Sequence, residues 1–308
     1  MKPKIFIDGA EGTTGLQIRD RLGPRRDIEL LEIADSQRKN VSERKSLINS
    51  ADIVFLCLPD DAAREAVALI ENPDTRVIDA STAHRVCDGW DYGFPELSDA
   101  RRAAIAVSRR VANPGCHATG FLAIVYPLIA LGILPRDYPL ACFSLTGYSG
   151  GGKKMIARYE TEKTPELSHP GIYALAQDHK HLPEMTHIAG LARAPVFSPV
   201  IDDYYSGMAV TVALHADLLD AAKSAEEIRA ALAEHYAGAR FVSVAEDPGE
   251  GTLYSGFGVG TNALEITAAG SDGRIAVTAR FDNLGKGASG AAVQNMNLML
   301  GIDEGTGL

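Results

Sequence analysis

The chain has 308 residues, of which 46% are hydrophobic and 23% are charged, and its formal net charge is −10. A chain of this length can bury a large core and normally folds as two domains. The acidic balance argues against a nucleic acid or an anionic membrane as partner. No apolar run reaches the roughly 20 residues that span a bilayer, and the first residues lack the apolar segment of a signal peptide. We therefore expect a cytoplasmic protein.

Strand and helix patterns alternate through the first hundred residues. Four short apolar runs are typical of buried strands: residues 4–7, 28–34, 53–58 and 76–79. Helical spacing follows the first and third of them, at 16–22 and 61–70. Strands separated by helices indicate a parallel sheet covered on both faces, the doubly wound arrangement.

The pattern changes after about residue 116. A helix-like apolar stretch at 121–131 is followed by longer strand candidates with fewer helices between them. These candidates are residues 141–146, 209–214, 241–244, 263–269 and 274–281. We therefore expect a second domain with a mixed or antiparallel sheet, of α+β character. A last helical stretch at 288–300 is expected to pack back on the first domain.

A glycine-rich turn joins the first strand to the first helix. Gly9, Gly12 and Gly15 have the spacing G-x-x-G-x-x-G, and Thr13 and Thr14 stand between the last two. Glycines let the backbone approach a pyrophosphate, which then lies at the positive end of the helix. A tight turn without a ligand would leave the same pattern. The position at the first strand–helix junction favours dinucleotide binding.

The end of the second predicted strand carries two conflicting signals about the nucleotide. Asp35 stands about twenty residues after the turn, where an acid would hold a ribose hydroxyl of NAD. Ser36, Arg38 and Lys39 follow at once and are suited to the 2′-phosphate of NADP. The basic pair favours NADP.

Residues 113–120, N-P-G-C-H-A-T-G, form the most distinctive motif in the chain. Pro114 and Gly115 turn the chain just ahead of Cys116, and an apolar helical pattern starts behind it. A thiolate at the N-terminus of a helix is stabilised by the helix dipole and the backbone N–H groups, which can also hold the oxyanion of a tetrahedral adduct. A buried structural cysteine is the alternative. We favour a nucleophile, and we expect His117 to pack or hydrogen-bond rather than transfer protons.

The other three cysteines lie outside such a turn. Cys57, Cys87 and Cys142 form no C-x-x-C pair with one another or with Cys116. This usage fits a reducing compartment better than a disulfide framework or a zinc site. Cys57 lies in an apolar run and is expected to be a buried strand residue.

A nucleophilic thiolate needs a partner that moves protons. His179 and His181 stand close to Glu184 in the segment D-H-K-H-L-P-E. On a strand the two histidines would share a face, and on a helix they would not. A zinc site is the alternative interpretation, but no further Cys or His at ligand spacing completes it. We therefore expect no metal.

The motif around Cys116 resembles the active-site signature of the N-acetyl-γ-glutamyl-phosphate reductases, which usually reads x-P-G-C-[Phe/Tyr]-x-T-G. His117 stands where that family has an aromatic residue. Residues 79–85 match the family's D-x-S-x-x-x-R run, again with a histidine, His84, where an aromatic is usual.

Three further segments are similar to the family's Y-G-L-P-E-L, H-x-H-x-P-E and K-G-A-x-G-x-A-V-Q-N: residues 92–97, 179–184 and 285–295. The resemblance extends from residue 9 to about residue 295. The length suits the short (type 2) class of the family.

The resemblance implies the architecture of the aspartate-semialdehyde and glyceraldehyde-phosphate dehydrogenases. The implied fold is α/β, a doubly wound, Rossmann-like NADP-binding domain with an α+β domain. Residues 1–115 and 286–308 would bind NADP, and residues 116–285 would form the catalytic, substrate and dimerisation domain. The implied assembly is a homodimer or a homotetramer. The resemblance adds Ser81, Lys286 and Gly287 to the expected cofactor site.

The implied reaction is the NADPH-dependent reduction of N-acetyl-γ-glutamyl phosphate to N-acetylglutamate 5-semialdehyde and inorganic phosphate, in arginine biosynthesis. The Cys116 thiolate attacks the acyl phosphate and expels phosphate, and the resulting thioester takes hydride from the nicotinamide. We favour His181 as the acid–base group, with His179 as the alternative and Glu184 as an orienting group.

Three residues are candidates for binding the substrate. Arg85 suits a phosphate or a carboxylate, because a guanidinium matches either anion, and a surface arginine is the alternative. Ser149 and Lys153 lie in a glycine-rich loop that resembles the family's S-G-x-G and is suited to substrate oxygens. A flexible linker is the alternative for that loop.

Two rival functions remain open. An aspartate-semialdehyde dehydrogenase would perform the same chemistry on a smaller acid, but the H-x-H-x-P-E segment and the short length oppose it. A non-catalytic dinucleotide-sensing protein would keep the fold alone. The presence of both Cys116 and the histidine pair opposes that reading.

Overall fold

The chain divides into two compact units in the computed structural model, which describes residues 2–246 and 251–308. The first unit comprises Met1–Pro114 and Ala288–Leu308, and the second comprises Gly115–Gly287. Lys286 and Gly287, which the sequence analysis assigned to the dinucleotide domain, therefore group with the second unit. Within the described ranges, no helix is long and apolar enough to cross a membrane.

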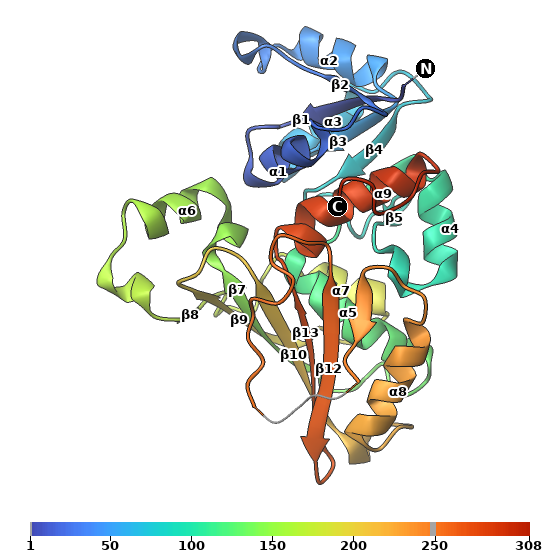
Figure 1. Cartoon of the computed structure of the whole chain (residues 1–308), viewed down its shortest axis with the longest axis vertical. Helices are drawn as coiled ribbons and strands as arrows, with labels where there is room; N and C mark the ends of the chain where they lie inside the picture. The colour runs from blue at the N-terminus through green and yellow to red at the C-terminus, as the bar shows by residue number, and fades with distance from the viewer. Residues whose placement is uncertain (1, 247–250) are drawn as a thin grey trace. The chain divides into compact units, whose positions relative to one another are not determined.

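The first unit contains a six-stranded sheet of order β2-β1-β3-β4-β6-β5 in which each neighbouring pair is parallel (Figure 1). Its strands are β1 (Lys4–Asp8), β2 (Glu29–Leu31), β3 (Ile53–Leu56), β4 (Arg76–Asp79), β5 (Asp91–Tyr92) and β6 (Arg110–Ala112). Its helices are α1 (Thr13–Leu22), α2 (Val41–Ser50), α3 (Asp60–Ala68), α4 (Asp99–Val107) and α9 (Gly290–Met299).

The first sheet is buried on both faces. Successive side chains of a strand point to opposite faces, so Ile5 and Ile7 of β1 belong to one apolar cluster and Phe6 belongs to another. Helices α1 and α9 contribute to the first cluster, and α2 and α3 contribute to the second. All four residues of β3 are buried, as expected for a strand covered on both sides. The doubly wound arrangement is confirmed.

The second unit contains a seven-stranded mixed sheet of order β11-β12-β13-β10-β7-β9-β8. Its strands are β7 (Ala141–Gly147), β8 (Gly171–Ile172), β9 (Val196–Asp202), β10 (Met208–His215), β11 (Val242–Val244), β12 (Leu264–Ser271) and β13 (Arg274–Phe281). Its helices are α5 (Cys116–Ala130), α6 (Gly152–Glu160), α7 (Leu182–Ala189) and α8 (Ala225–His235). The expected α+β character is confirmed.

Helix α5 packs directly on the second sheet. A Cβ atom at Gly120 would lie 2.5 Å from a methyl carbon of Val210 on β10 and 2.8 Å from the ring of Phe281 on β13. Glycine at this position therefore allows a close approach that no other residue would allow without repacking. This approach fixes the helix whose first residue is Cys116.

Two predicted strands of the first unit end earlier in the structure than expected. Residues 53–58 were expected to form one strand, but β3 ends at Leu56, so Cys57, expected as a buried strand residue, follows the strand and is partly exposed. Residues 28–34 were expected to form a strand, but β2 ends at Leu31, and residues 35–37 form a short 3₁₀ helix. Asp35 therefore lies beyond the strand, in a separate turn of helix.

Candidate active site

The turn after β1 has the geometry of a pyrophosphate-binding loop. Gly9 has a φ of +89°, and a Cβ atom there would lie 2.4 Å from the carbonyl oxygen of Cys57. A Cβ atom at Gly15 would lie 2.4 Å from the carbonyl oxygen of Gly9. Only glycine permits this close approach of the turn to its surroundings.

The N-terminus of α1 is suited to an anion. Gly12 occupies the N-cap position, and no side chain caps the helix there. The first N–H groups of α1, from Thr13 onward, are therefore suited to phosphate oxygens. The hydroxyl oxygen of Thr13 is also buried and has no hydrogen-bond partner among the described residues. These features fit a dinucleotide phosphate.

A cavity of about 270 Å³ opens beside the same turn. Its wall includes Glu11, Asp35 and Arg38, whereas Ser36 and Lys39 are exposed and lie outside it. The Arg38 guanidinium is 2.8 Å from an Asp35 oxygen and 3.4 Å from a Glu11 oxygen. Three residues were expected to hold a 2′-phosphate. Of these, Arg38 lines the cavity, and Ser36 and Lys39 do not.

Ser81 and His84 both contact the buried carboxylate of Asp79 at the end of β4. The Ser81 hydroxyl donates to Asp79 Oδ2 over 2.7 Å, and its N–H donates to Oδ1 over 2.9 Å. His84 Nδ1 is 2.6 Å from Asp79 Oδ2, and the His84 ring stacks on Trp90 with a centroid distance of 4.1 Å. No role was expected for His84 from its sequence context, and in the structure its ring contacts a buried carboxylate.

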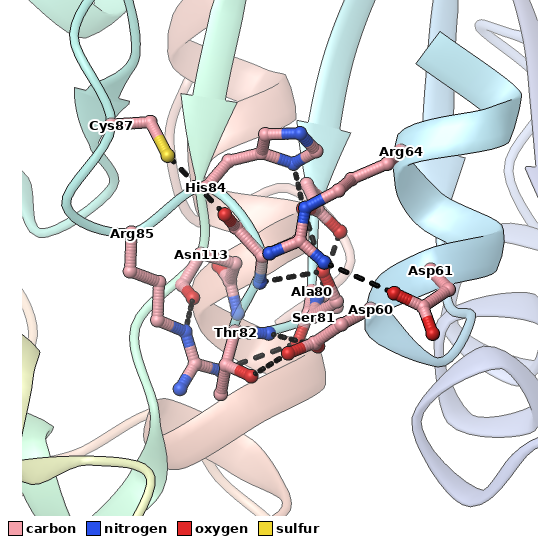
Figure 2. Close-up of polar contacts among 12 residues, drawn as sticks. Asp60, Asp61, Arg64, Ala80, Ser81, Thr82, His84, Arg85, Cys87 and Asn113 are labelled. Atoms are coloured by element: carbon pink, nitrogen blue, oxygen red, sulfur yellow. Dashed lines mark hydrogen bonds and ion pairs between the residues drawn. The ribbon is translucent and has the colours of Figure 1, made fainter. Parts of the chain in front are cut away.

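Arg85 is only 8% exposed, which excludes the surface-arginine alternative. Its Nε donates to the Asn113 carbonyl oxygen over 2.9 Å, and one terminal nitrogen donates to the Ala80 carbonyl oxygen over 3.2 Å. Figure 2 shows the side chain reaching to Asn113. These hydrogen bonds hold the guanidinium in one orientation beside the end of β4.

Cys116 is the first residue of α5, with Gly115 at the N-cap position. Its side chain is partly exposed, whereas Cys142 is buried. Burial, with smaller contributions from Asp79 and Asp8, raises the pKa of the Cys57 thiol to about 12, and burial also raises the pKa of Cys142. Cys116 therefore combines access with the N-terminal end of a helix, which favours a thiolate.

Gly287 allows the chain to pass close to Cys116. A Cβ atom at Gly287 would lie 2.9 Å from the Cβ atom of Cys116. The neighbouring Lys286 is buried, with its ammonium 5.8 Å from the centre of the Phe241 ring. Both residues were expected on the cofactor side, and the structure adds a packing role against Cys116 for Gly287.

Glu184 links the N-terminus of α7 to the N-terminus of α5. It is 1% exposed, and its Oε2 accepts the N–H of Gly115 over 3.1 Å. Its other oxygen, Oε1, lies 4.0 Å from Nε2 of His181. The segment 179–184 is thus held against the turn that presents Cys116.

Three imidazole rings cluster around His117, the residue that follows Cys116. The ring centres of His117, His179 and His181 are 4.7–5.6 Å apart. The histidine pair lies on neither a strand nor a helix, because His179 is in an irregular segment and His181 is the N-cap of α7. The backbone N–H of His181 donates to Nδ1 of His179 over 3.1 Å, which leaves Nε2 as the protonated nitrogen of a neutral His179.

Tyr173, Ser144 and Phe197 belong to the same cluster and carried no signal in the sequence. Tyr173 Oη and Ser144 Oγ are each 2.7 Å from a ring nitrogen of His117. The ring of Phe197 packs edge-on against His117 and His179, with centroid distances of 5.3 and 5.2 Å. These partners come from β7, from β9 and from the loop after β8.

The proposed substrate loop is ordered by hydrogen bonds rather than extended as a linker. Ser149 is buried, and its hydroxyl accepts from the side-chain amide of Asn283 over 3.0 Å. Lys153 is exposed at the start of α6. Within the described ranges, no group of three or more His, Cys, Asp or Glu side chains is arranged to hold a metal ion.

Comparisons with known proteins extend over both units. Residues 4–105 match the model of the semialdehyde dehydrogenase NAD-binding domain, and residues 116–283 match the semialdehyde dehydrogenase dimerisation domain. The N-acetyl-γ-glutamyl-phosphate reductase 2 of Nostoc sp. is 50% identical, over 100% of this chain and 99% of that protein. The N-acetyl-γ-glutamyl-phosphate reductase of Sinorhizobium medicae is 49% identical, over 97% of this chain and 99% of that protein.

Among solved structures, the fold is similar to that of aspartate semialdehyde dehydrogenase II from Vibrio cholerae in complex with ASA. The TM-score is 0.76 at 16% identity, over 97% of this chain and 98% of that chain. Identity this low shows the fold alone, whereas the full-length identities near 50% show a closer relationship. The chain belongs to the N-acetyl-γ-glutamyl-phosphate reductases, within the semialdehyde dehydrogenase family of oxidoreductases.

Proposed function

We propose that the protein catalyses the NADPH-dependent reduction of N-acetyl-γ-glutamyl phosphate to N-acetylglutamate 5-semialdehyde and inorganic phosphate. The observation that carries the proposal is the position of Cys116 at the first turn of α5. The residues on either side of it, Gly115 and His117, both contact the segment 179–184. The relatives near 50% identity carry the name of this reaction.

Cys116 is the nucleophile in this proposal. Its thiolate attacks the carbonyl carbon of the acyl phosphate, and the collapse of the tetrahedral adduct expels phosphate and leaves a thioester. The N–H groups at the start of α5 hold the developing oxyanion. NADPH, when bound, supplies the hydride that reduces the thioester. The aldehyde then leaves as the thiolate is restored.

His181 is our candidate for moving the proton during this exchange, with His179 as the alternative. Glu184 would orient His181, because its carboxylate lies 4.0 Å from Nε2 of that ring. Its hydrogen bond to the Gly115 N–H also ties the acid–base segment to the turn before Cys116. The same carboxylate thus positions both groups.

The cofactor is NADP(H), and the first unit offers the groups that suit it. The glycine turn and the α1 N-terminus suit the pyrophosphate, Arg38 suits the 2′-phosphate, and Ser81 lies at the end of β4 on the same edge of the sheet. We further propose that Arg85 binds the phosphate or carboxylate of the substrate, and that Ser149 and Lys153 bind its oxygens.

We also propose that the protein acts in the cytoplasm as a homodimer or a homotetramer. The match to a dimerisation domain over residues 116–283 supports self-association through the second unit. Sedimentation or light scattering of the purified chain tests it. A monomer at micromolar concentration would contradict this assembly.

The test of function is phosphate-dependent reduction of NADP⁺ with N-acetylglutamate semialdehyde, run beside aspartate semialdehyde. We expect turnover of N-acetylglutamate semialdehyde but not of aspartate semialdehyde. This turnover should require added phosphate, and it should be lost in Cys116→Ser. Cys87→Ser is the matched control, because that thiol is exposed and lies outside the proposed chemistry. Turnover without phosphate, or equal turnover of aspartate semialdehyde, would contradict the proposal.

A further inference from the structure

The segment between β8 and α7 carries the histidine pair, and its backbone is strained. Ala174 and Gln177 have φ values of +53° and +58°, in the left-handed region that residues other than glycine rarely adopt. Such a conformation persists only where the surrounding structure imposes it. The contacts of this segment with β9 therefore decide where it places His179.

Strand β9 turns one of its edges toward this segment. On its other edge it pairs with β7 along its whole length, but on this edge β8 pairs only with Val200 and Ile201. The N–H of Tyr173 still donates to the carbonyl oxygen of Pro199 over 3.1 Å, and the chain then enters an irregular segment. Strand β8 therefore ends before it reaches Phe197.

The side-chain amide of Gln177 pairs with β9 beyond the end of β8. Its Nε2 donates to the carbonyl oxygen of Phe197 over 2.8 Å, and its Oε1 accepts the N–H of Phe197 over 2.8 Å. A primary amide offers both a donor and an acceptor, so it can satisfy both backbone groups of one residue. These two hydrogen bonds, the Gln177–Phe197 clamp, attach the irregular segment to the edge of the sheet.

Phe197 extends this restraint to the imidazole rings. It is 1% exposed, and its ring lies edge-on to His179 and to His117, at centroid distances of 5.2 and 5.3 Å. His179 is only two positions after Gln177, and its Nδ1 accepts the backbone N–H of His181 over 3.1 Å. The clamp therefore acts on the histidine pair in two ways, through the chain and through the Phe197 ring.

We propose that Gln177 is a positioning residue, whose clamp on Phe197 fixes the place of the histidine pair. This role rests on the proposed function, because it takes the pair to contain the acid–base group. Gln177 and His179 line the same cavity of about 720 Å³, so a substrate in that cavity can reach His179. An acid–base group must lie within hydrogen-bond reach of the proton that it moves. A small displacement of the pair therefore slows proton transfer, although Gln177 touches no reacting atom.

Hydrogen exchange at the Phe197 N–H tests the clamp without substrate. Gln177→Ala and Gln177→Met, which keeps the length of the side chain, should each accelerate this exchange about tenfold through the loss of one hydrogen bond. Gln177→Glu keeps the acceptor, so it should leave the exchange closer to the wild-type rate. Equal protection of the Phe197 N–H in wild type and in Gln177→Ala would overturn the proposal.

The side-chain NMR signals of the eight histidines report the place of the rings. In Gln177→Ala the signals of His179 and His181 should shift, whereas the signal of His84, which belongs to the first unit, should not. Faster exchange at Phe197 with unshifted signals of the pair would contradict the positioning role. It would mean that the clamp holds the strand edge but not the histidines.

Steady-state kinetics separate positioning from a general loss of structure. Gln177→Ala should lower kcat by about 10–100-fold and leave KM nearly unchanged. Gln177 is exposed, so water can replace its amide and the Tm should change little. Leu175→Ala is the matched control, because Leu175 lies in the same segment, is 78% exposed and should leave kcat unchanged.

Two kinetic results would contradict the positioning role. One is an equal loss of kcat in Leu175→Ala, and the other is a rise of KM in Gln177→Ala without a fall of kcat. A wild-type protein without turnover would instead refute the proposed function. Hydrogen exchange and the histidine signals would then still decide whether the clamp places the pair, because neither measurement needs a substrate.

Discussion

Replacing His117 with phenylalanine should change how the stability of the protein depends on pH. In the folded chain, burial, with smaller contributions from His179 and Lys180, lowers the pKa of His117 from its ordinary value of 6.5 to about 3. Below about pH 6.5 the unfolded chain therefore binds a proton that the folded chain does not bind. The folded state loses stability as the pH falls, by up to about 1.4 kcal/mol per pH unit from this one residue.

The size of the effect follows from that difference. Between about pH 7.5 and pH 5, the His117 contribution to the free energy of unfolding falls by about 2 kcal/mol. His117→Phe removes this term, but it also removes both hydrogen bonds of the ring and leaves the Ser144 hydroxyl buried without its partner. That loss costs about 1–3 kcal/mol at every pH. The variant should be less stable than wild type at neutral pH and should approach it as the pH falls.

Urea unfolding followed by circular dichroism at several pH values between 7.5 and 5 measures this convergence. Ser144→Ala is the matched control, because it removes one hydrogen bond but keeps the titrating ring, so its stability should run parallel to that of wild type. A constant difference between His117→Phe and wild type across the range would refute the reasoning. It would mean that His117 accepts a proton in the folded state.

The remaining predictions concern the proposed chemistry. Cys116→Ser should keep the fold and NADPH binding but lose nearly all turnover, because a serine hydroxyl ionises poorly near pH 7; retention of most activity would exclude thioester catalysis. His181→Ala should lower kcat by about 10²–10⁴-fold, less than the loss in Cys116→Ser, and an unchanged kcat would leave His179 as the candidate. NADPH should be preferred over NADH, and Arg38→Ala should reduce that preference; equal catalytic efficiency of wild type with both cofactors would show that Asp35 dominates. Arg85→Ala should raise KM for phosphate in the NADP⁺-reducing direction while leaving the Kd of NADPH unchanged by fluorescence titration, and unchanged kinetics would remove Arg85 from the site.

The strands of the first unit could be predicted because each is covered on both faces. A strand such as β3, with four buried residues, reads as a continuous apolar run whatever surrounds it. Strand β9 gave no such signal, because Pro199 interrupts its apolar run and argues against a strand inside a sheet. Helix α2 was missed for a different reason. Ile48 is its one buried residue, so its sequence has little apolar periodicity.

The site contains residues that local sequence could predict and residues that only the fold brings together. Cys116 was predictable because the turn before it and the helix after it are adjacent in sequence. The partners of His117 were not, because Ser144 and Tyr173 lie 27 and 56 positions away. The packing of α5 on the second sheet, together with the pairing of β7, β9 and β8 within that sheet, brings them together. The hydrogen bond of Arg85 likewise reaches the carbonyl oxygen of Asn113, 28 positions away in the chain.

An acidic chain that binds an anionic dinucleotide must compensate the acids closest to it. The formal charge is −10, and β1 and β4 both end in a buried carboxylate, Asp8 and Asp79. Arg44 contacts both oxygens of Asp8, at distances down to 2.7 Å, and His84 lies 2.6 Å from Asp79. Ligands of doubly wound folds bind at this edge of the sheet. The Arg44 guanidinium therefore reduces the repulsion that a pyrophosphate would meet from Asp8, and it does so without changing the acidic balance of the chain as a whole.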